Sequence, residues 1–166
     1  MNAEDVELVY VWENDPLLWE FSYAVSPYSH DDIRRIIDVA APEKFDENGQ
    51  LRFMIELVGT GEAVGAIDLT DHVEGVSRAA VGVLVYDEGH RGKGYAAEAL
   101  KLLSEHAAER LKLHQLYAYM PSDNRASIAL FTSAGFAECG LIKDWVRDPR
   151  GRWKDAVMMQ LVFAVV

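Results

Sequence analysis

The sequence predicts an α+β fold in a single domain, and three observations support that prediction. The hydrophobic spacing changes from helical to alternating near residue 51. A strand, a glycine-rich turn, a helix and a second strand follow one another between residues 79 and 120. Two more strands end the chain. At 166 residues the chain is long enough to bury a substantial core as one domain, residues 1–166.

The first helix is expected close to the start of the chain. Asn2 or Asp5 can cap it, and it stops at residues 14–16, which read Asn-Asp-Pro. The stretch that follows, residues 17–28, is rich in aromatic side chains. These can pack the first helices onto the sheet, or Trp19, Phe21 and Tyr23 can line a cleft that receives an ammonium group by cation–π contact.

A second helix is predicted from Ser29, which is its expected N-cap. Asp32 stands three residues further on, in a variant of the capping box. The helical spacing ends at Pro42, and residues 42–50 are predicted to form a polar loop.

The rest of the chain predicts a sheet with two more helices. A four-residue turn, residues 59–62, joins two strands into a hairpin. The strand–helix–strand unit after it should be a right-handed parallel crossover. The expected strands are 51–58, 63–70, 79–85, 115–120, 136–146 and 153–162, and the later helices are 95–111 and 126–134, the last closed by Gly135.

Charge and composition limit the classes of partner. The net charge is −11, which argues against a nucleic-acid partner. Residues 1–50 hold 12 acidic and 3 basic side chains, so most of that charge lies there. It can be a solvated face, or a rim that attracts a cationic substrate such as an amine. No apolar run approaches the ~20 residues that a membrane span needs.

The single cysteine, Cys139, excludes a disulfide framework within the chain and a cysteine-based zinc cluster. No signal peptide is recognised at the start of the sequence. The expected compartment is therefore the cytoplasm, and no metal is expected.

The turn after the strand 79–85 is typical of a phosphate site. Glycines allow a close backbone approach, and the N–H groups of the first helical turn point at the anion. Arg91 and Lys93 add positive charge. The glycine spacing does not fit a nucleoside-triphosphate P-loop. Residues 92–97 do fit the dinucleotide pattern G-x-G-x-x-A, but the strands that should follow in a Rossmann domain are missing.

Two blocks together resemble the GNAT superfamily of acetyl-CoA-dependent N-acetyltransferases. Arg91-x-x-Gly94-x-Ala96 matches the superfamily's [Q/R]-x-x-G-x-[G/A] signature. Residues 124–136 resemble its N-x-x-S-x-x-L-Y-x-x-x-G-F segment in order and spacing. The branch that the chain resembles contains ribosomal-protein N-terminal acetyltransferases and spermidine acetyltransferases.

The resemblance implies a mixed, mostly antiparallel sheet of about six to seven strands, with a splayed parallel pair and about four flanking helices. Relatives usually begin with a strand before the first helix. Here Met1 stands almost at that helix, so we expect this edge strand to be missing or supplied in another way.

The resemblance also implies where acetyl-CoA, the co-substrate, would bind. Pantetheine would lie between the splayed strands and the pyrophosphate on the amides of the glycine-rich turn, with a backbone N–H near Val85 holding the thioester oxygen. The second block would complete the site. The expected cofactor-binding residues are Val83, Leu84, Val85, His90, Arg91, Gly92, Lys93, Gly94, Tyr95, Ala96, Asn124, Ser127 and Phe131.

The catalytic positions depart from the family pattern. Where relatives often carry a glutamate and a tyrosine, this chain has Ala80 and Phe131, which cannot exchange a proton. Asp71 and His72 are candidate replacements for the base, and Tyr119 for the acid that protonates the thiolate. The alternative for His72 is a solvated loop histidine, and for Tyr119 it is ordinary packing.

The sequence therefore favours transfer of an acetyl group to a primary amine, with a small-molecule amine such as a polyamine or amino-acid derivative preferred. The amine would attack directly in a ternary complex. A catalytically degenerate acyl-CoA-binding module, a protein N-terminal acetyltransferase and a nucleotide-binding oxidoreductase remain alternatives. A homodimer is expected to be possible, because exposed sheet edges can pair.

Overall fold

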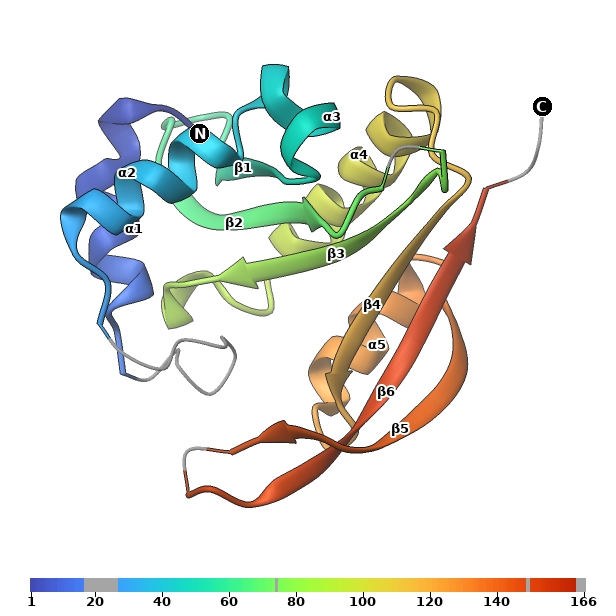
Figure 1. The fold of residues 1–166 in the computed structure, drawn as a ribbon. Helices are drawn as coiled ribbons and strands as arrows, with labels where there is room; N and C mark the ends of the chain where they lie inside the picture. The colour runs from blue at the N-terminus through green and yellow to red at the C-terminus, as the bar shows by residue number, and fades with distance from the viewer. Residues whose placement is uncertain (17–26, 74, 149, 164–166) are drawn as a thin grey trace.

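The computed structural model describes residues 1–16, 27–73, 75–148 and 150–163. They form a six-stranded mixed sheet with the strand order β1-β2-β3-β4-β6-β5 and helices on both faces (Figure 1). The strands are β1 (Leu51–Glu56), β2 (Ala63–Thr70), β3 (Arg78–Val85), β4 (Gln115–Pro121), β5 (Ala137–Arg147) and β6 (Trp153–Val162). The helices are α1 (Val6–Glu13), α2 (His30–Val39), α3 (Phe45–Asn48), α4 (Tyr95–Glu109) and α5 (Arg125–Ser133). The predicted α+β fold is thus confirmed.

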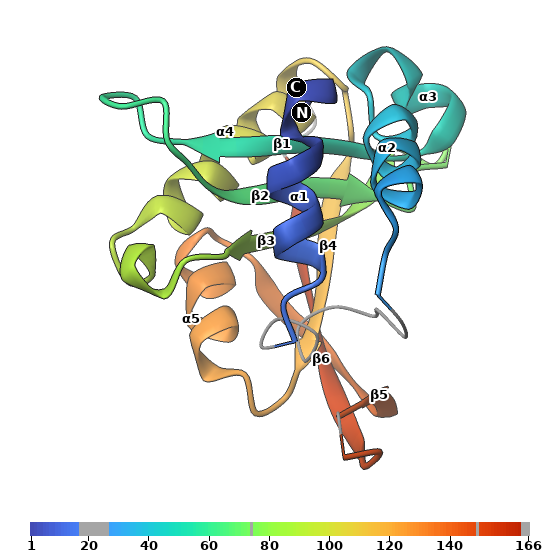
Figure 2. The same ribbon diagram turned by 90° about the vertical axis from the view of Figure 1, so that its left-hand side faces the viewer.

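The two faces of the sheet carry different helices (Figures 1 and 2). On one face, here the α4 face, the main core joins α4 and α5 to the strands, and Leu100 of α4, Leu69 of β2 and Leu116 of β4 are all fully buried in it. On the other, the α1 face, a smaller core joins α1 and α2 through Val9 and Ile33. Alternate strand residues therefore point into different environments.

The predicted cap is confirmed at α2, whereas at α1 the N-cap residue Asp5 makes no capping hydrogen bond with its side chain. The Ser29 hydroxyl accepts from the Asp32 N–H at 3.2 Å, and Asp32 accepts from the Ser29 N–H at 2.9 Å. Asn2 and Asp5 form a similar reciprocal pair around a 3₁₀ turn, Ala3–Asp5, which leads into α1. Each pair satisfies backbone N–H groups that a helix leaves without partners.

The prediction of a polar loop at residues 42–50 is wrong. A 3₁₀ turn, Pro42–Lys44, and the short helix α3 occupy this segment. Phe45 is the cause, because its side chain is only 3% exposed and stacks on the His72 ring at 4.5 Å between centroids. The single aromatic residue in a charged stretch was the available signal.

The expected splayed pair is present. β3 and β4 are parallel, but only Arg78–Ala80 pair with Gln115–Tyr117. β3 then continues to Val85 and β4 to Pro121 without a shared ladder. We call the space between these unpaired parts of β3 and β4 the gap. In the described part of the chain no strand precedes α1, so β1 is an edge of the sheet.

Candidate functional site

A tight turn links β3 to α4 at the open end of the gap. Asp87 organises it, because its carboxylate accepts from the Gly89 N–H at 2.9 Å and lies 2.7 Å from His90 Nδ1. The hydrogen bond from Gly89, together with His90, lowers the pKa of Asp87. The contact with Asp87 holds the His90 ring against the turn.

The glycines of the turn adopt conformations that other residues avoid. Gly92 has φ +73° and Gly94 has φ +91°. No N–H group from Gly92 to Ala97 donates to an acceptor among the described residues. Because α4 starts at Tyr95, these amides lie at the positive end of the helix dipole, an arrangement suited to binding an anion.

The two cations of the turn have different surroundings. The Arg91 guanidinium donates to the carbonyl oxygens of Val85 at 2.9 Å and Tyr86 at 3.1 Å. The Arg91 N–H donates to Glu88 at 3.1 Å. Arg91 therefore secures the end of β3, and the exposed Lys93 is the side chain directed to solvent at the turn.

Only alternate residues of β3 direct their backbone into the gap. The Tyr86 N–H donates to Val64 of β2 at 3.1 Å, so Leu84 and Gly82 also direct their backbone groups at β2. The backbone groups of Val83 and Val85 then face the gap. The expectation that the Leu84 backbone pairs with pantetheine does not fit this register, because its backbone groups are directed at β2.

The second sequence block caps and terminates α5. The Asn124 carboxamide accepts from the Ser127 N–H at 3.1 Å, so these two residues contact each other. Phe131 is 5% exposed and packs edge-to-face on Phe136 at 5.0 Å between centroids. It therefore belongs to the core on the α4 face and brings no polar group to the gap.

The three predicted catalytic side chains separate into two sites. His72 lies 3.4 Å from the Arg78 carbonyl through Nδ1, and its side chain is 9% exposed against Phe45. His72 therefore packs between Phe45 and the start of β3, where β3 and β4 are still paired. Asp71, by contrast, accepts from the Tyr117 hydroxyl at 3.4 Å.

Tyr117 is a site residue that the sequence analysis missed. Its ring lies edge-on to Tyr119 at 5.4 Å, and Tyr119 in turn lies 5.9 Å from Trp145. Burial and then the Asp71 charge raise the pKa of Tyr117, so its hydroxyl stays protonated at neutral pH. Both tyrosines line a cavity of about 210 Å³ beside the last rungs of the β3–β4 pairing.

A second missed cluster lies on the α1 face and joins β1, α1, β2 and the residue that follows β3. Arg52 of β1 contacts Glu13 of α1 and Asp68 of β2, each at 2.9 Å. The Tyr86 hydroxyl donates to Glu13 at 3.3 Å, and its ring stacks on Trp12 at 4.1 Å. The available signal was an aspartate in an otherwise apolar strand.

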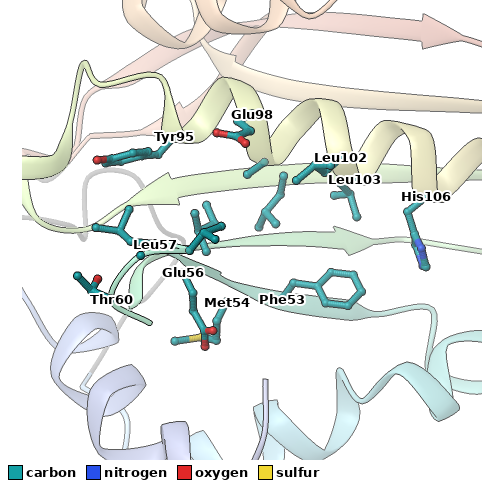
Figure 3. Close-up of a pocket in the computed structure, with 15 residues that line it drawn as sticks. Phe53, Met54, Glu56, Leu57, Thr60, Tyr95, Glu98, Leu102, Leu103 and His106 are labelled. Carbon is teal, nitrogen blue, oxygen red and sulfur yellow. The ribbon is translucent and has the colours of Figure 1, made fainter. Parts of the chain in front are cut away.

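A larger cavity, of about 820 Å³, lies apart from the gap. It is bounded by the β1–β2 hairpin and α4, whose side chains face each other across it (Figure 3). Tyr95, the first residue of α4, lines one end, and Phe53 meets His106 edge-on at 5.8 Å elsewhere along it. Its lining includes no residue of β4 or α5, so it is separate from the splayed strands.

The aromatic residues Trp19, Phe21 and Tyr23, proposed to line an acceptor cleft, lie outside the described residues. Within residues 1–16, 27–73, 75–148 and 150–163, no group of three or more metal-ligating side chains is positioned to hold an ion. None of the helices described there has the length and apolar character that crossing a bilayer requires.

Comparison with known proteins identifies the class to which this fold and turn belong. The family model of the acetyltransferase (GNAT) domain matches residues 1–137. The chain therefore belongs to the GNAT acetyltransferase family and is an acyltransferase.

Individual relatives agree with this assignment. The chain is 29% identical over 171 residues to the uncharacterized N-acetyltransferase p20 of Bacillus licheniformis, covering 98% of this chain and 89% of the relative. It is 22% identical over 160 residues to spermidine N(1)-acetyltransferase of Escherichia coli K12, covering 96% and 81%. The crystal structure of a Vibrio cholerae spermidine N-acetyltransferase in complex with CoA and spermine is similar in fold, with a TM-score of 0.84, 20% identity and coverage of 98% and 92%.

Proposed function

We propose that the chain, as one domain, transfers the acetyl group of acetyl-CoA to the primary amine of a small molecule by direct attack in a ternary complex. The observation that supports the proposal is that the gap between β3 and β4 leads directly to the glycine-rich turn. The gap opens after three rungs of parallel pairing, and its open end meets a turn with six backbone N–H groups without an acceptor among the described residues.

Acetyl-CoA fits this continuity. The diphosphate would lie on the amides of residues 92–97, with Lys93 as the mobile counter-charge. The pantetheine arm would extend along Val83 and Val85 as an added strand, where the Val85 N–H can polarise the thioester carbonyl. His90 and Arg91 would shape the turn, while Asn124, Ser127 and Phe131 would support the other wall through α5.

The amine would approach from the α1 face. The α4 face below the gap is filled by the main core, including Val81, Met120 and Phe131. Tyr117, Tyr119 and Asp71 lie on the open side, and Tyr117 is a suitable proton donor for the departing thiolate because it remains protonated.

A small cationic amine is the favoured acceptor. The two spermidine acetyltransferases above act on such an amine, and the first 50 residues of this chain carry 12 acidic against 3 basic side chains. A peptide N-terminus is the second candidate, because both acceptors present a primary amine. Ala80 and Phe131 favour the third, an acyl-CoA-binding module without turnover.

Release of free CoA thiol from acetyl-CoA, measured against a panel of amines, tests the proposal. The panel contains spermidine, amino-acid amides and a peptide with a free N-terminus. We expect the highest kcat/KM with a small polycationic amine. Highest kcat/KM with the peptide would favour the second candidate, and tight binding of acetyl-CoA without turnover would favour the third.

A matched pair of lysine variants tests the cofactor site. Lys93→Ala should raise the KM for acetyl-CoA about 10-fold, which is the effect of losing one charge-assisted contact. Lys101→Ala removes an exposed lysine of α4 that pairs with Glu105 at 3.9 Å, and it should leave that KM unchanged. Equal effects would contradict the placement of the diphosphate.

Two further expectations remain proposals. A homodimer is supported by β1, an edge strand beside the apolar cavity of about 820 Å³. Light scattering of the purified protein measures the oligomeric state.

The cytoplasm remains the proposed compartment, because the chain has one cysteine and so no internal disulfide.

A further inference from the structure

The carboxylate of Asp68 lies close to the position that Ala80 leaves without an acid–base group. Asp68 pairs with Gly82 across the β2–β3 ladder. A methyl group placed on Gly82 would lie only 2.6 Å from Asp68 Oδ1, so the carboxylate occupies the space of a β3 side chain. Gly82 comes two residues after Ala80, the last residue of β3 that pairs with β4. The carboxylate thus lies over β3 where the gap begins.

Arg52 fixes the orientation of this carboxylate. Its Nε and Nη2 atoms lie 3.0 Å and 2.9 Å from Asp68 Oδ2. Both contacts use the same oxygen, and the other oxygen, Oδ1, is the one over Gly82. A carboxylate held in this way presents one oxygen in a constant position, as proton transfer requires.

The charges around Asp68 favour a cation. The titratable groups that face it are Arg52 of β1, Glu13 of α1 and the Tyr86 hydroxyl after β3. Tyr86 is neutral, since burial and the nearby Glu13 raise its pKa. Both carboxylates contact the same guanidinium, and carboxylates gathered on this face favour the approach of an ammonium group.

Burial makes Asp68 more basic than an ordinary aspartate. Burial raises the pKa of Asp68. The positive charge of Arg52 lowers it, but by less, so the net shift is upward. The side chain is still 22% exposed, on the α1 face from which the amine is proposed to approach. It is therefore both reachable and a better proton acceptor than a solvated carboxylate.

We propose that Asp68 is the general base that removes the proton from the acceptor ammonium. This inference rests on the proposed acetyl transfer to an amine and adds the group that makes the amine nucleophilic. Asp68 of β2 would thus act as the base in place of the glutamate that relatives often carry at the Ala80 position of β3. His72, whose ring stacks on Phe45, is then a packing residue.

The proton and electron balance of the step is complete. The ammonium R–NH₃⁺ gives one proton to Asp68, and the freed nitrogen lone pair forms a bond to the thioester carbonyl carbon. The C–S bond breaks, and its electron pair leaves with the thiolate. A second nitrogen proton reaches the thiolate to give the CoA thiol, the third stays on the amide, and Asp68 returns its proton to solvent.

The pH dependence of turnover in Asp68→Asn tests the proposal. Asparagine keeps the shape and can still bond Arg52, but it cannot accept the proton. We expect kcat for an alkylamine to fall about 10²- to 10⁴-fold, the usual contribution of a general base, with the KM for acetyl-CoA unchanged. The fall of kcat/KM at low pH should disappear. An aromatic amine, which is neutral at pH 7, should lose less than about 10-fold.

Glu13→Gln is the matched control, because Glu13 shares Arg52 but does not lie over Gly82. It should retain the fall of kcat/KM at low pH. The Asp68→Asn, Ala80→Glu double variant should recover part of the lost kcat, since it returns a carboxylate to the neighbouring β3 position.

Three results would overturn the proposal: kcat of Asp68→Asn within about threefold of wild type, equal loss with both classes of amine, or the same pH profile in Asp68→Asn and Glu13→Gln. If Asp68→Asn does not fold, Gly82→Ala displaces the carboxylate by steric contact instead, and unchanged kcat there overturns it. Failure of the wild type to acetylate any amine would count against the proposed function itself.

Discussion

At the scale of single residues, the turn between β3 and α4 depends on glycine because of backbone conformation rather than space. Gly94 has φ +91°, and a methyl group added to it would meet no atom within 4 Å. The cost of replacing it therefore comes from the left-handed conformation.

Gly94→Ala is expected to lower the free energy of unfolding by about 1–2 kcal/mol, the cost of a left-handed non-glycine residue. The KM for acetyl-CoA should rise as well, because relief of the strain rotates the amides. Urea unfolding and steady-state kinetics measure the two effects. Gly89→Ala is the control in the same turn, because Gly89 has no positive φ and its added methyl would lie 3.4 Å from Asp87. A similar loss in both variants would contradict this explanation.

At the scale of elements, the turn between β3 and α4 is held from both sides. Asp87 binds Gly89 and His90 inside it, and Arg91 binds the last carbonyls of the strand. The turn is therefore ordered before any ligand binds. Preorganised amides lose less entropy on binding an anion than mobile ones.

The stability that the Asp87 charge contributes should depend on pH in a defined direction. The pKa of Asp87 is lowered in the folded state below its ordinary value of 3.8. The charged carboxylate therefore stabilises the fold fully above that ordinary value, and the contribution is lost as pH falls through the lowered pKa. Asp87→Asn keeps an acceptor for Gly89 but removes the charge.

Asp87→Asn should thus be less stable than wild type at pH 6, and the difference should shrink towards pH 3. Urea unfolding at both pH values measures it. Asp87→Ala, which also loses the acceptor, should keep a deficit at both. A difference between wild type and Asp87→Asn that grows as pH falls would contradict the expected sign.

At the scale of the whole molecule, one buried cluster connects the N-terminal helix to the sheet. Arg52 binds Glu13 of α1 and Asp68 of β2, and the exposed fractions of the three side chains are 22%, 12% and 22%. Both carboxylates contact the same guanidinium. The α1 face, on which the amine would bind, is therefore assembled around a charge pairing rather than an apolar contact alone.

Arg52→Met should lower the free energy of unfolding at pH 7 by about 3–5 kcal/mol, because it removes the guanidinium that the largely buried Asp68 carboxylate contacts twice. Without Arg52 the pKa of Asp68 rises further, so the folded variant binds protons more tightly than the unfolded chain. The deficit should then shrink as pH falls towards 5. Urea unfolding across this pH range measures it.

Arg34→Met is the control for Arg52→Met. Arg34 pairs with Asp31 at 2.7 Å on an exposed face of α2, so its loss should change stability little at any pH. A deficit in Arg52→Met that stays constant between pH 7 and 5 would show that lost packing, not charge, is the cause.

The chemistry of the cofactor side could be predicted from local sequence. Gly92, Gly94 and the helix at Tyr95 lie within four residues, so the turn, its free amides and the start of α4 follow from adjacent residues. The spacing of the second block likewise located the Asn124 cap and the end of α5. The β1–β2 hairpin and the parallel pairing of β3 with β4 across α4 followed from the pattern of strands and helices.

The acceptor side could not be predicted in this way. Asp68 and Gly82 are 14 positions apart, Arg52 and Glu13 are 39 apart, and Tyr117 meets Asp71 across 46. Sequence alone determined the fold class and the glycine-rich turn, because the spacing of strands, helices and glycines is read from residues close together in the chain. Only the tertiary structure decided which carboxylate lies over the gap, since strand register, and not distance along the chain, brings Asp68 over a glycine.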